Sequence, residues 1–215
     1  MQHPKINTPI YAIDFEGSKA IGILEFAIIE IVDWKITSIE THLCKPKGKV
    51  DKKTLAFCHL NEELLKDKVA FEGHINTFLQ ARRKGLFLAH NKATEDSLLR
   101  LYFPNPEVFS DFSNNSKCLS WSPWIDTYRL CKKIFPKLKS YNLSELISAF
   151  NLTEELKALA KTHCPSDRAK WHCAPYDTIA AALLLIKIAT LDGFENLDLA
   201  WLCELSGNKK ELSLD

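Results

Sequence analysis

The sequence lacks the features that mark membrane, secreted or disordered proteins. Its longest apolar stretch, residues 179–186, ends at Lys187, whereas a membrane-spanning helix needs about 20 apolar residues. No basic segment followed by an apolar segment and small residues precedes Tyr11, so we expect a cytoplasmic protein with no membrane partner. Hydrophobic residues make up 46% of the chain, which excludes disorder for most of it.

The cysteines lack the pattern of a disulfide framework or a redox motif. There are 7 of them, an odd number, and no two form a Cys-x-x-Cys pair. A chain of 215 residues buries roughly 70% of its unfolded surface and needs no disulfide to hold a core. We therefore expect reduced, mostly buried thiols. Two His-Cys pairs, His163-Cys164 and His172-Cys173, raise the alternative of zinc, but their spacing matches no standard zinc motif.

The chain also lacks an excess of charge of either sign. Lys and Arg number 28 against 27 Asp and Glu, a formal net charge of +1. Any affinity for nucleic acid must therefore come from local patches. Residues 129–139 carry five basic residues and no acid, and residues 162–171 contain Arg168, Lys170 and Trp171. Cations beside an aromatic ring suit the phosphates and bases of a single strand, although each patch also has an alternative interpretation as ordinary solvated surface.

The order of apolar patterns predicts an α/β fold with a mixed sheet. Residues 10–16, 21–32 and 36–44 have strand patterns with short connections, as in an antiparallel meander. The remaining expectations follow in chain order: a helix over 71–82 ending at Gly85, a strand over 86–89, a helix over 93–102, a loop over 104–123, a strand over 124–126, a helix capped by Asn142, a helix from Pro175 to about 191, and a helical tail over 196–205.

Two acids on the first predicted strand are the first sign of chemistry. Asp14 and Glu16 are two residues apart, so their side chains project from the same face of the strand. Two buried carboxylates on one face repel each other and lose hydration unless a cation offsets both costs. Mg²⁺ and Mn²⁺ prefer oxygen ligands of this kind. The alternative is that one acid lies at the exposed end of the strand.

Further acids occur where they can converge on this pair. His90 and Asn91 follow the strand over 86–89, and Glu95 and Asp96 open the next helix. Asp177 lies in the first turn of the helix that Pro175 starts, where the helix dipole favours negative charge, and His172 precedes that helix. Carboxylates with a nearby imidazole suit metal-assisted hydrolysis of a phosphodiester.

The three motifs in this order resemble those of the DEDDh 3′→5′ exonucleases, the DnaQ-like family of proofreading subunits, ribonuclease T and oligoribonuclease. Ile13-Asp14-Phe15-Glu16-Gly17 matches the first motif, and the segment from His172 to Asp177 matches the third. Residues 124–130 and 141–146 resemble the segments between the second and third motifs. Each motif alone is weak, but three in order with matching intervening segments are specific, and the resemblance covers residues 9–190.

This resemblance implies a ribonuclease H-like fold with a five-stranded mixed sheet flanked by helices. Residues 1–191 would form the exonuclease domain, and residues 192–215 a helical tail packed on it. Two Mg²⁺ or Mn²⁺ ions would be bound by Asp14, Glu16, the acid of the second motif and Asp177, with His172 as general base. The substrate would be a single-stranded 3′ end, DNA slightly favoured over RNA, and the products nucleoside 5′-monophosphates. A polymerase or repair protein is a possible partner; the alternative function is a non-catalytic binding module.

Two departures from the family pattern leave questions open. In the second motif Glu95 has the expected spacing and Asp96 the usual residue type, but adjacent helical residues point about 100° apart, so only one should face the ions. The spacing slightly favours Glu95. Gly17-Ser18 stands where the family often has Thr, and we expect it beside the terminal nucleotide because Gly permits close approach. Phe15 is a candidate for packing on the terminal base, or equally a core residue.

Overall fold

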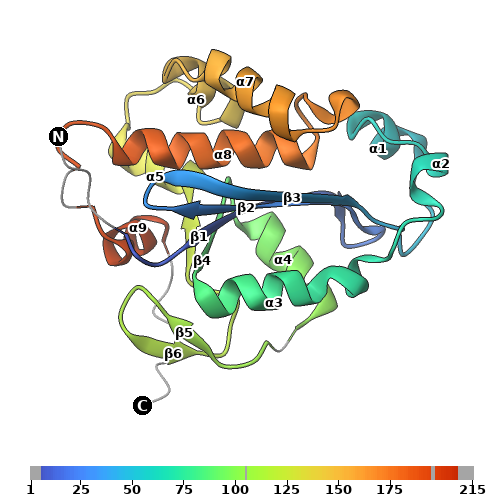
Figure 1. The fold of residues 1–215 in the computed structure, drawn as a ribbon, viewed down its shortest axis with the longest axis horizontal. Coiled ribbons are helices and arrows are strands. Elements are labelled where there is room, and N and C mark those ends of the chain that lie inside the picture. Colours follow the sequence, from blue (N-terminus) through green and yellow to red (C-terminus); the bar gives the residue numbers. More distant parts are fainter. Residues whose placement is uncertain (1–5, 105, 195–196, 208–215) are drawn as a thin grey trace.

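A five-stranded mixed sheet forms the centre of the protein, as predicted (Figure 1). The computed structural model describes residues 6–104, 106–194 and 197–207. The strand order is β3-β2-β1-β4-β7, with β1 antiparallel to β2, β2 antiparallel to β3, and β1, β4 and β7 parallel to one another. The strands are β1 (Ile10–Ser18), β2 (Gly22–Val32), β3 (Lys35–Leu43), β4 (Leu86–Ala89) and β7 (Trp124–Asp126).

Burial of the strands follows their sequence patterns. β2 is apolar at nearly every position and is buried on both faces, as is β4. β3 alternates between apolar and polar residues and lies at the edge of the sheet, where one set of side chains meets solvent. The alternation of apolar and polar residues in β3 thus fits an edge strand with one solvent-facing side, and the continuous apolar run of β2 fits a strand buried on both faces.

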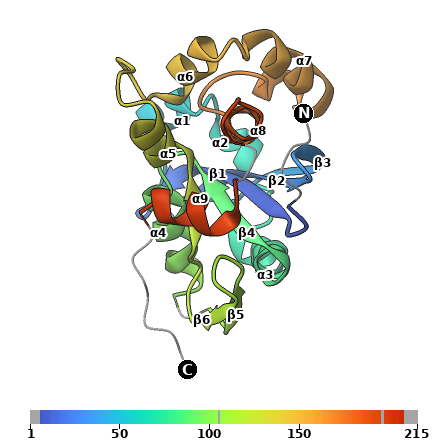
Figure 2. The same ribbon diagram turned by 90° about the vertical axis from the view of Figure 1, so that its left-hand side faces the viewer.

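Helices cover both faces of the sheet, as Figure 2 shows. On one face α8 (Ala174–Ala189) packs on β1 and β2, and α6 (Leu143–Ala149) and α7 (Thr153–His163) pack on α8. The other face carries α3 (Ile75–Lys84) and α4 (Ala93–Tyr102). The two faces enclose separate apolar clusters. Of the described helices, none is both long enough and apolar enough to cross a membrane.

The structure contains short elements that the sequence patterns did not predict. The predicted loop over 104–123 includes a small hairpin, β5 (Phe109–Asp111) and β6 (Ser116–Cys118). Helical segments also occur at α1 (Lys52–Phe57), α2 (Glu62–Leu65), α5 (Thr127–Ile134), α7 and η2 (Ser166–Arg168). All of them except α7 are too short for hydrophobic periodicity to show; α7, with 11 residues, is a helix that was missed from the sequence. The helix predicted over 71–82 begins as a short 3₁₀ helix, η1 (Phe71–His74), before α3. Asn142 does precede α6, but its side chain makes no capping hydrogen bond.

The C-terminal helix packs on the same body as the rest of the chain. α9 (Leu199–Leu205) contacts α5 and β7, and Leu202 and Cys203 are buried in the cluster that contains α8. The backbone N–H of Asp126 donates to Ser206 Oγ (2.8 Å). The predicted tail over 196–205 therefore contains a helix from Leu199 onward; residues 195–196 and 208–215 lie outside the described residues.

Candidate active site

The ends of three parallel strands bring the predicted site residues to one edge of the sheet. β1, β4 and β7 run in the same direction, so their carboxyl ends lie together. Asp14 and Glu16 come from the second half of β1, and Glu95 comes from α4, which follows β4. The N-terminal turn of α8 supplies Asp177 from above the sheet. Residues up to 163 positions apart in the sequence, Asp14 and Asp177, thus contribute to one site.

Three carboxylates form the centre of this site. Asp14, Glu16 and Asp177 each offer one oxygen atom, and these atoms all lie within 4.8 Å of one another. Asp14 and Glu16 share the face of β1 that also carries Ala12 and Ile10, which pack in the α8 cluster. Alternation along the strand and the position of Asp177 in the first turn of the helix account for the convergence.

Glu95 lies next to this group, whereas Asp96 turns elsewhere. Glu95 is only 4% exposed, and its negative charge is one of those that raise the pKa of Asp14. Asp96 Oδ2 instead accepts a hydrogen bond from Arg100 Nε, one helical turn on (2.8 Å). The geometry therefore brings Glu95, not Asp96, toward the other acids, in agreement with the spacing argument.

The four acids hold their protons more tightly than ordinary carboxylic acids. Burial, followed by the charge of Asp177, raises the pKa of Asp14 well above its usual range. Burial raises the pKa of Glu16 to about 7, and that of Glu95 and of Asp177 to about 8. Each of these carboxylates feels the charge of at least one other acid, and such mutual repulsion is what a bound cation relieves.

The oxygen atoms present fit a hard divalent cation. Within the described part of the chain, Glu95 Oε2 and Asp177 Oδ1 are buried without any hydrogen-bond partner. Asp96 Oδ1 and Asp126 Oδ2 are also buried without one, but the other oxygen of Asp96 is paired with Arg100, and Asp126 Oδ2 lies 3.6 Å from Arg129 Nε. Unsatisfied buried oxygens are rare and need an explanation, such as an ion. Carboxylates without any nitrogen or sulfur donor suit Mg²⁺ or Mn²⁺ better than zinc.

A fifth acid beside the group is already neutralised by a buried ion pair. Glu25 lies directly opposite Glu16 in the β1–β2 ladder. Arg168 donates to both of its oxygens, from Nε (2.8 Å) and Nη2 (2.6 Å), and the backbone N–H of Ala174 donates to Oε2 (2.9 Å). This pair ties the start of α8 to the sheet. In the part of the chain that the structure describes, none of Asp14, Glu16 and Asp177 forms an ion pair with a basic side chain.

Two residues predicted to contact nucleic acid are instead parts of the core. Arg168 is 2% exposed and occupied by Glu25, so it cannot reach a phosphate, and that prediction is wrong. Phe15 points to the opposite face of β1 from the acids and packs on Phe71 and Phe78, with ring centroids 5.6 and 5.4 Å away. Phe15 cannot share the face of Asp14 and Glu16, because successive side chains of a strand point to opposite faces.

The other predicted contact residues remain at the surface or near it. Ser18 and Lys170 are exposed, and Trp171 is half-buried with its ring edge-on to Tyr176. Gly17 (φ +146°) sits at a bulge in the β1–β2 pairing, where a Cβ atom would collide with the carbonyl oxygen of Gly22. Glycine at this position is therefore already required by the fold, independently of any ligand.

His172 lies at the rim of the carboxylate group. Its backbone has a positive φ (62°), and its N–H donates to Asp177 Oδ2 (3.2 Å). The exposed imidazole packs against the ring of Phe57, with 4.1 Å between ring centroids. Nearby, Cys58 Sγ donates to Glu16 Oε2 (3.2 Å). Sequence patterns gave no indication that this end of α1 borders the site, because α1 has only six residues.

A turn of polar contacts fixes the start of α4 and so the direction of Glu95. His90 Nδ1 lies 2.9 Å from Thr127 Oγ1, and its Nε2 lies 3.0 Å from the carbonyl oxygen of Tyr141. Asn91 has a positive φ (69°), and its N–H donates to Asp126 Oδ1 (3.0 Å). The expectation that His90 and Asn91 organise the turn agrees with this geometry. The role of Asp126 as a hub that also caps α5 was missed.

A match to a protein-family model identifies the family of the chain. Residues 13–185 match the model of the RNase T exonuclease family. The chain belongs to this exonuclease family. The match begins just before Asp14 and ends after Asp177, so all four acids and His172 fall inside the exonuclease domain.

Individual relatives of this exonuclease domain are distant. The chain is 24% identical over 173 residues to exodeoxyribonuclease 10 of Escherichia coli, which covers 80% of the chain and 64% of that relative. It is 25% identical over 146 residues to the PolC-type DNA polymerase III of Thermotoga petrophila, covering 66% of the chain. The chain spans only 10% of that polymerase's length.

Solved structures share the fold of the exonuclease domain. Exonuclease X in complex with 5′ overhanging duplex DNA superposes with a TM-score of 0.66 at 22% identity, covering 92% of this chain and 99% of that one. A 3′-exonuclease that recognises a histone mRNA stem-loop gives a TM-score of 0.66 at 11% identity, covering 89% and 66%. These structures support the ribonuclease H-like architecture predicted from the sequence.

The cysteines of the chain are reduced and largely buried. All 7 are free thiols; six are buried and Cys164 is half-buried, as predicted. Neither His-Cys pair belongs to a group of three or more possible metal ligands among the described residues. Burial raises the pKa of Cys173 to about 12 and that of Cys164 to about 11, so both stay protonated at neutral pH.

Metal-free protein should lose stability as the pH rises. The folded pKa values of about 7 to about 8 exceed those of unfolded carboxylic acids, so the folded state binds more protons between about pH 4 and about pH 8. We expect the melting temperature in EDTA to fall across this window. Mn²⁺, which favours the ionised acids, should raise the melting temperature more at high pH than at low pH.

The matched control for this experiment is the double variant Asp14→Asn/Asp177→Asn. It removes two of the coupled carboxylates, so its melting temperature should depend less on pH and should respond little to Mn²⁺. A wild-type melting temperature in EDTA that rises from about pH 5 to about pH 8 would contradict the assignment.

Breaking the Arg168–Glu25 pair should destabilise the fold. Arg168→Met leaves Glu25 as a buried carboxylate without its guanidinium, which costs roughly 3–5 kcal/mol in unfolding experiments. The double variant Arg168→Met/Glu25→Gln should be more stable than Arg168→Met, because it removes the stranded charge. Lys170→Met, at an exposed neighbour, is the control. If the Arg168→Met protein is as stable as this control but has a raised KM for nucleic acid, Arg168 binds substrate and does not stabilise the fold.

Proposed function

We propose that this protein is a metal-dependent 3′→5′ exonuclease that removes nucleoside 5′-monophosphates from single-stranded ends. The observation that carries the proposal is the group of Asp14, Glu16 and Asp177, with oxygens within 4.8 Å of one another, in a chain of the exonuclease family. Glu95 beside this group completes a set of four acids from three elements.

The four acids would hold two divalent cations, Mg²⁺ or Mn²⁺. When bound, such ions lower the pKa of a water molecule and neutralise charge on the phosphate and the leaving oxygen. The chain's own contribution is to fix the carboxylates before substrate arrives. The Arg168–Glu25 pair holds the start of α8, and the Asn91–Asp126 contact holds the start of α4.

His172 would act as the general base that takes a proton from the attacking water. Its backbone is anchored to Asp177 by the 3.2 Å hydrogen bond, while its imidazole lies exposed against Phe57. A side chain with an anchored backbone and an exposed ring can rotate from Phe57 toward the carboxylates. General bases of this kind typically contribute about 10²–10⁴-fold to the rate.

The single strand would approach over Gly17 and Ser18, which follow Glu16 on β1, and over Lys170 and Trp171, which directly precede His172; all four lie at or close to the surface. The exposed cations of residues 129–139 lie on and after α5, which follows β7 at the same edge of the sheet. DNA is the favoured substrate, because exodeoxyribonuclease 10 and the PolC-type polymerase are named for DNA. The polymerase relative also supports a polymerase or repair partner, and a cytoplasmic location stays a prediction from the sequence.

Labelled oligonucleotides test both the activity and the choice between Glu95 and Asp96. We expect 5′-labelled single-stranded DNA to shorten stepwise from its 3′ end with Mg²⁺ or Mn²⁺, and to stay intact with EDTA. Glu95→Gln should lose about 10²-fold or more of this rate, because it removes one ligand charge, whereas Asp96→Asn should lose far less. The two variants are neighbours and serve as matched controls for each other.

The same assay separates the competing outcomes. Equal losses in the two variants would remove the distinction between Glu95 and Asp96. Tight binding of the oligonucleotide without hydrolysis under any metal condition would favour the non-catalytic binding module. RNA shortened faster than DNA would reverse the substrate preference while keeping the activity.

Replacing His172 should slow hydrolysis without removing the metal site. We expect His172→Ala to lower kcat by about 10²–10⁴-fold and to leave the stabilisation by Mn²⁺ close to that of wild type. His163→Ala, at an exposed position on α7, is the control and should keep full activity. A parallel loss of Mn²⁺ stabilisation in His172→Ala would make His172 a ligand and not a base.

A further inference from the structure

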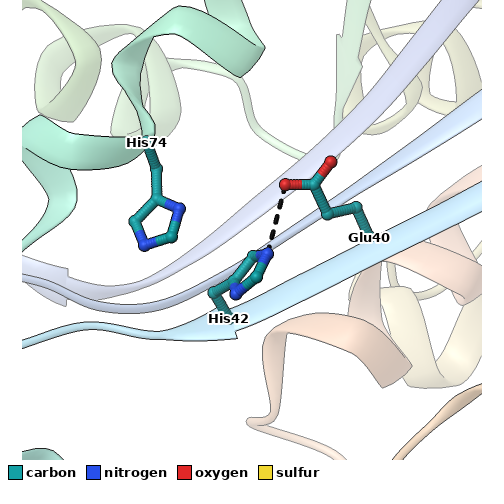
Figure 3. Close-up of side chains that lie close together, drawn as sticks. All are labelled: Glu40, His42 and His74. Atoms are coloured by element: carbon teal, nitrogen blue, oxygen red, sulfur yellow. Dashed lines mark hydrogen bonds and ion pairs between the residues drawn. The ribbon is translucent and has the colours of Figure 1, made fainter. Parts of the chain in front are cut away.

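A second group of possible metal ligands lies outside the active site. Glu40, His42 and His74 each offer one ligand atom, and these atoms all lie within 4.8 Å of one another (Figure 3). Glu40 and His42 are two residues apart on β3, so both project from one face of the edge strand. His74 comes from the end of η1, where α3 begins.

The strand pairing shows that this group and the active site lie on opposite faces of the sheet. His42 pairs with Phe26 and Glu40 with Ile28, whereas Asp14 pairs with Ala27 and Glu16 with Glu25. Neighbouring residues of β2 point to opposite faces. The group of Glu40, His42 and His74 is therefore independent of the catalytic acids.

The two imidazoles are already placed against each other. Their ring centroids are 4.6 Å apart, and His42 Nε2 lies 3.2 Å from Glu40 Oε1. The buried ring of Phe26 packs beneath both, with centroids 5.3 Å from His42 and 5.1 Å from His74. Thr77 Oγ1 lies 3.5 Å from Glu40 Oε1. An apolar floor with a polar neighbour behind a ligand is the usual surrounding of a metal site.

From this geometry we propose that Glu40, His42 and His74 bind one Zn²⁺ ion. Two imidazoles and a carboxylate form a common zinc ligand set, in which the fourth position is left to water. Ligand atoms about 2.0–2.1 Å from an ion lie at most about 4 Å apart, so a small side-chain rotation closes the present spacing. Glu40 and His42 side chains are 45% and 44% exposed, which gives the ion a path from solvent.

The bound ion would join two elements that are distant in sequence. β3 is an edge strand, and the η1–α3 segment packs on the sheet through Phe71 and Phe78, whose rings contact Phe26 of β2. A Zn²⁺ ion held by His42 and His74 would connect this strand to that segment. Because binding to the folded state alone raises stability by mass action, Zn²⁺ should raise the melting temperature.

The experiment measures Zn²⁺ binding with the catalytic acids removed. In the background Asp14→Asn/Asp177→Asn, we expect one equivalent of Zn²⁺ by calorimetry, an upward shift in melting temperature, and visible absorption bands on titration with Co²⁺. Adding His42→Ala or His74→Ala should weaken Zn²⁺ binding by about tenfold or more and remove the temperature shift. Adding His163→Ala should change neither, because that side chain is exposed on α7 and outside the group.

A second form of the experiment covers the case in which the background variant does not fold. Wild-type protein in excess Mg²⁺, which favours carboxylate oxygens over imidazole, is titrated with Zn²⁺ and compared with His42→Ala and His74→Ala. Both single variants should retain Mg²⁺-dependent hydrolysis, because the group lies on the other face of the sheet. Unchanged Zn²⁺ affinity in both variants, or no Zn²⁺ binding in wild type, would overturn the proposal without affecting the exonuclease assignment.

Discussion

Repulsion among crowded carboxylates is the constraint on which the rest of this structure depends. Asp14, Glu16 and Asp177 place oxygens within 4.8 Å of one another, and burial together with their mutual charge raises the pKa of each. Such an arrangement opposes folding, so the surrounding fold must hold it in place. The apolar core supplies that stability: β1 and β2 are buried strands of the sheet, and α8 packs on them.

Neutralised polar groups around the site do the positioning. Glu25 would add to the repulsion among the acids if it were unpaired. Arg168 and the N–H of Ala174 donate hydrogen bonds to its two oxygens, and these bonds anchor the first turn of α8. Asp126 has the same function on the other side, where it accepts from Asn91 and caps α5. Glu25 thus has both oxygens satisfied, whereas Glu95 and Asp177 each keep a buried oxygen without a hydrogen-bond partner.

The separation of the two faces of the sheet explains how one small domain can carry two different ligand sets. The α8 face holds carboxylates alone, which suit a hard cation, and the α3 face holds two imidazoles with one carboxylate, which suit zinc. Alternation along β1, β2 and β3 keeps the sets apart. It also explains why Phe15, between Asp14 and Glu16, belongs to the aromatic core under the second set.

The sequence by itself determined the long elements other than α7, the mixed sheet and the candidate acids, because continuous apolar runs, period-2 alternation and motif spacing are local properties of the chain. Spacing also favoured Glu95 over Asp96, and the Asp96–Arg100 pair agrees with it. Only the tertiary structure decided that Arg168 is buried against Glu25, that Phe57 borders His172, and that His74 meets His42. These contacts join residues 143, 115 and 32 positions apart. No local pattern encodes such pairs, since they arise from how the helices pack on the sheet.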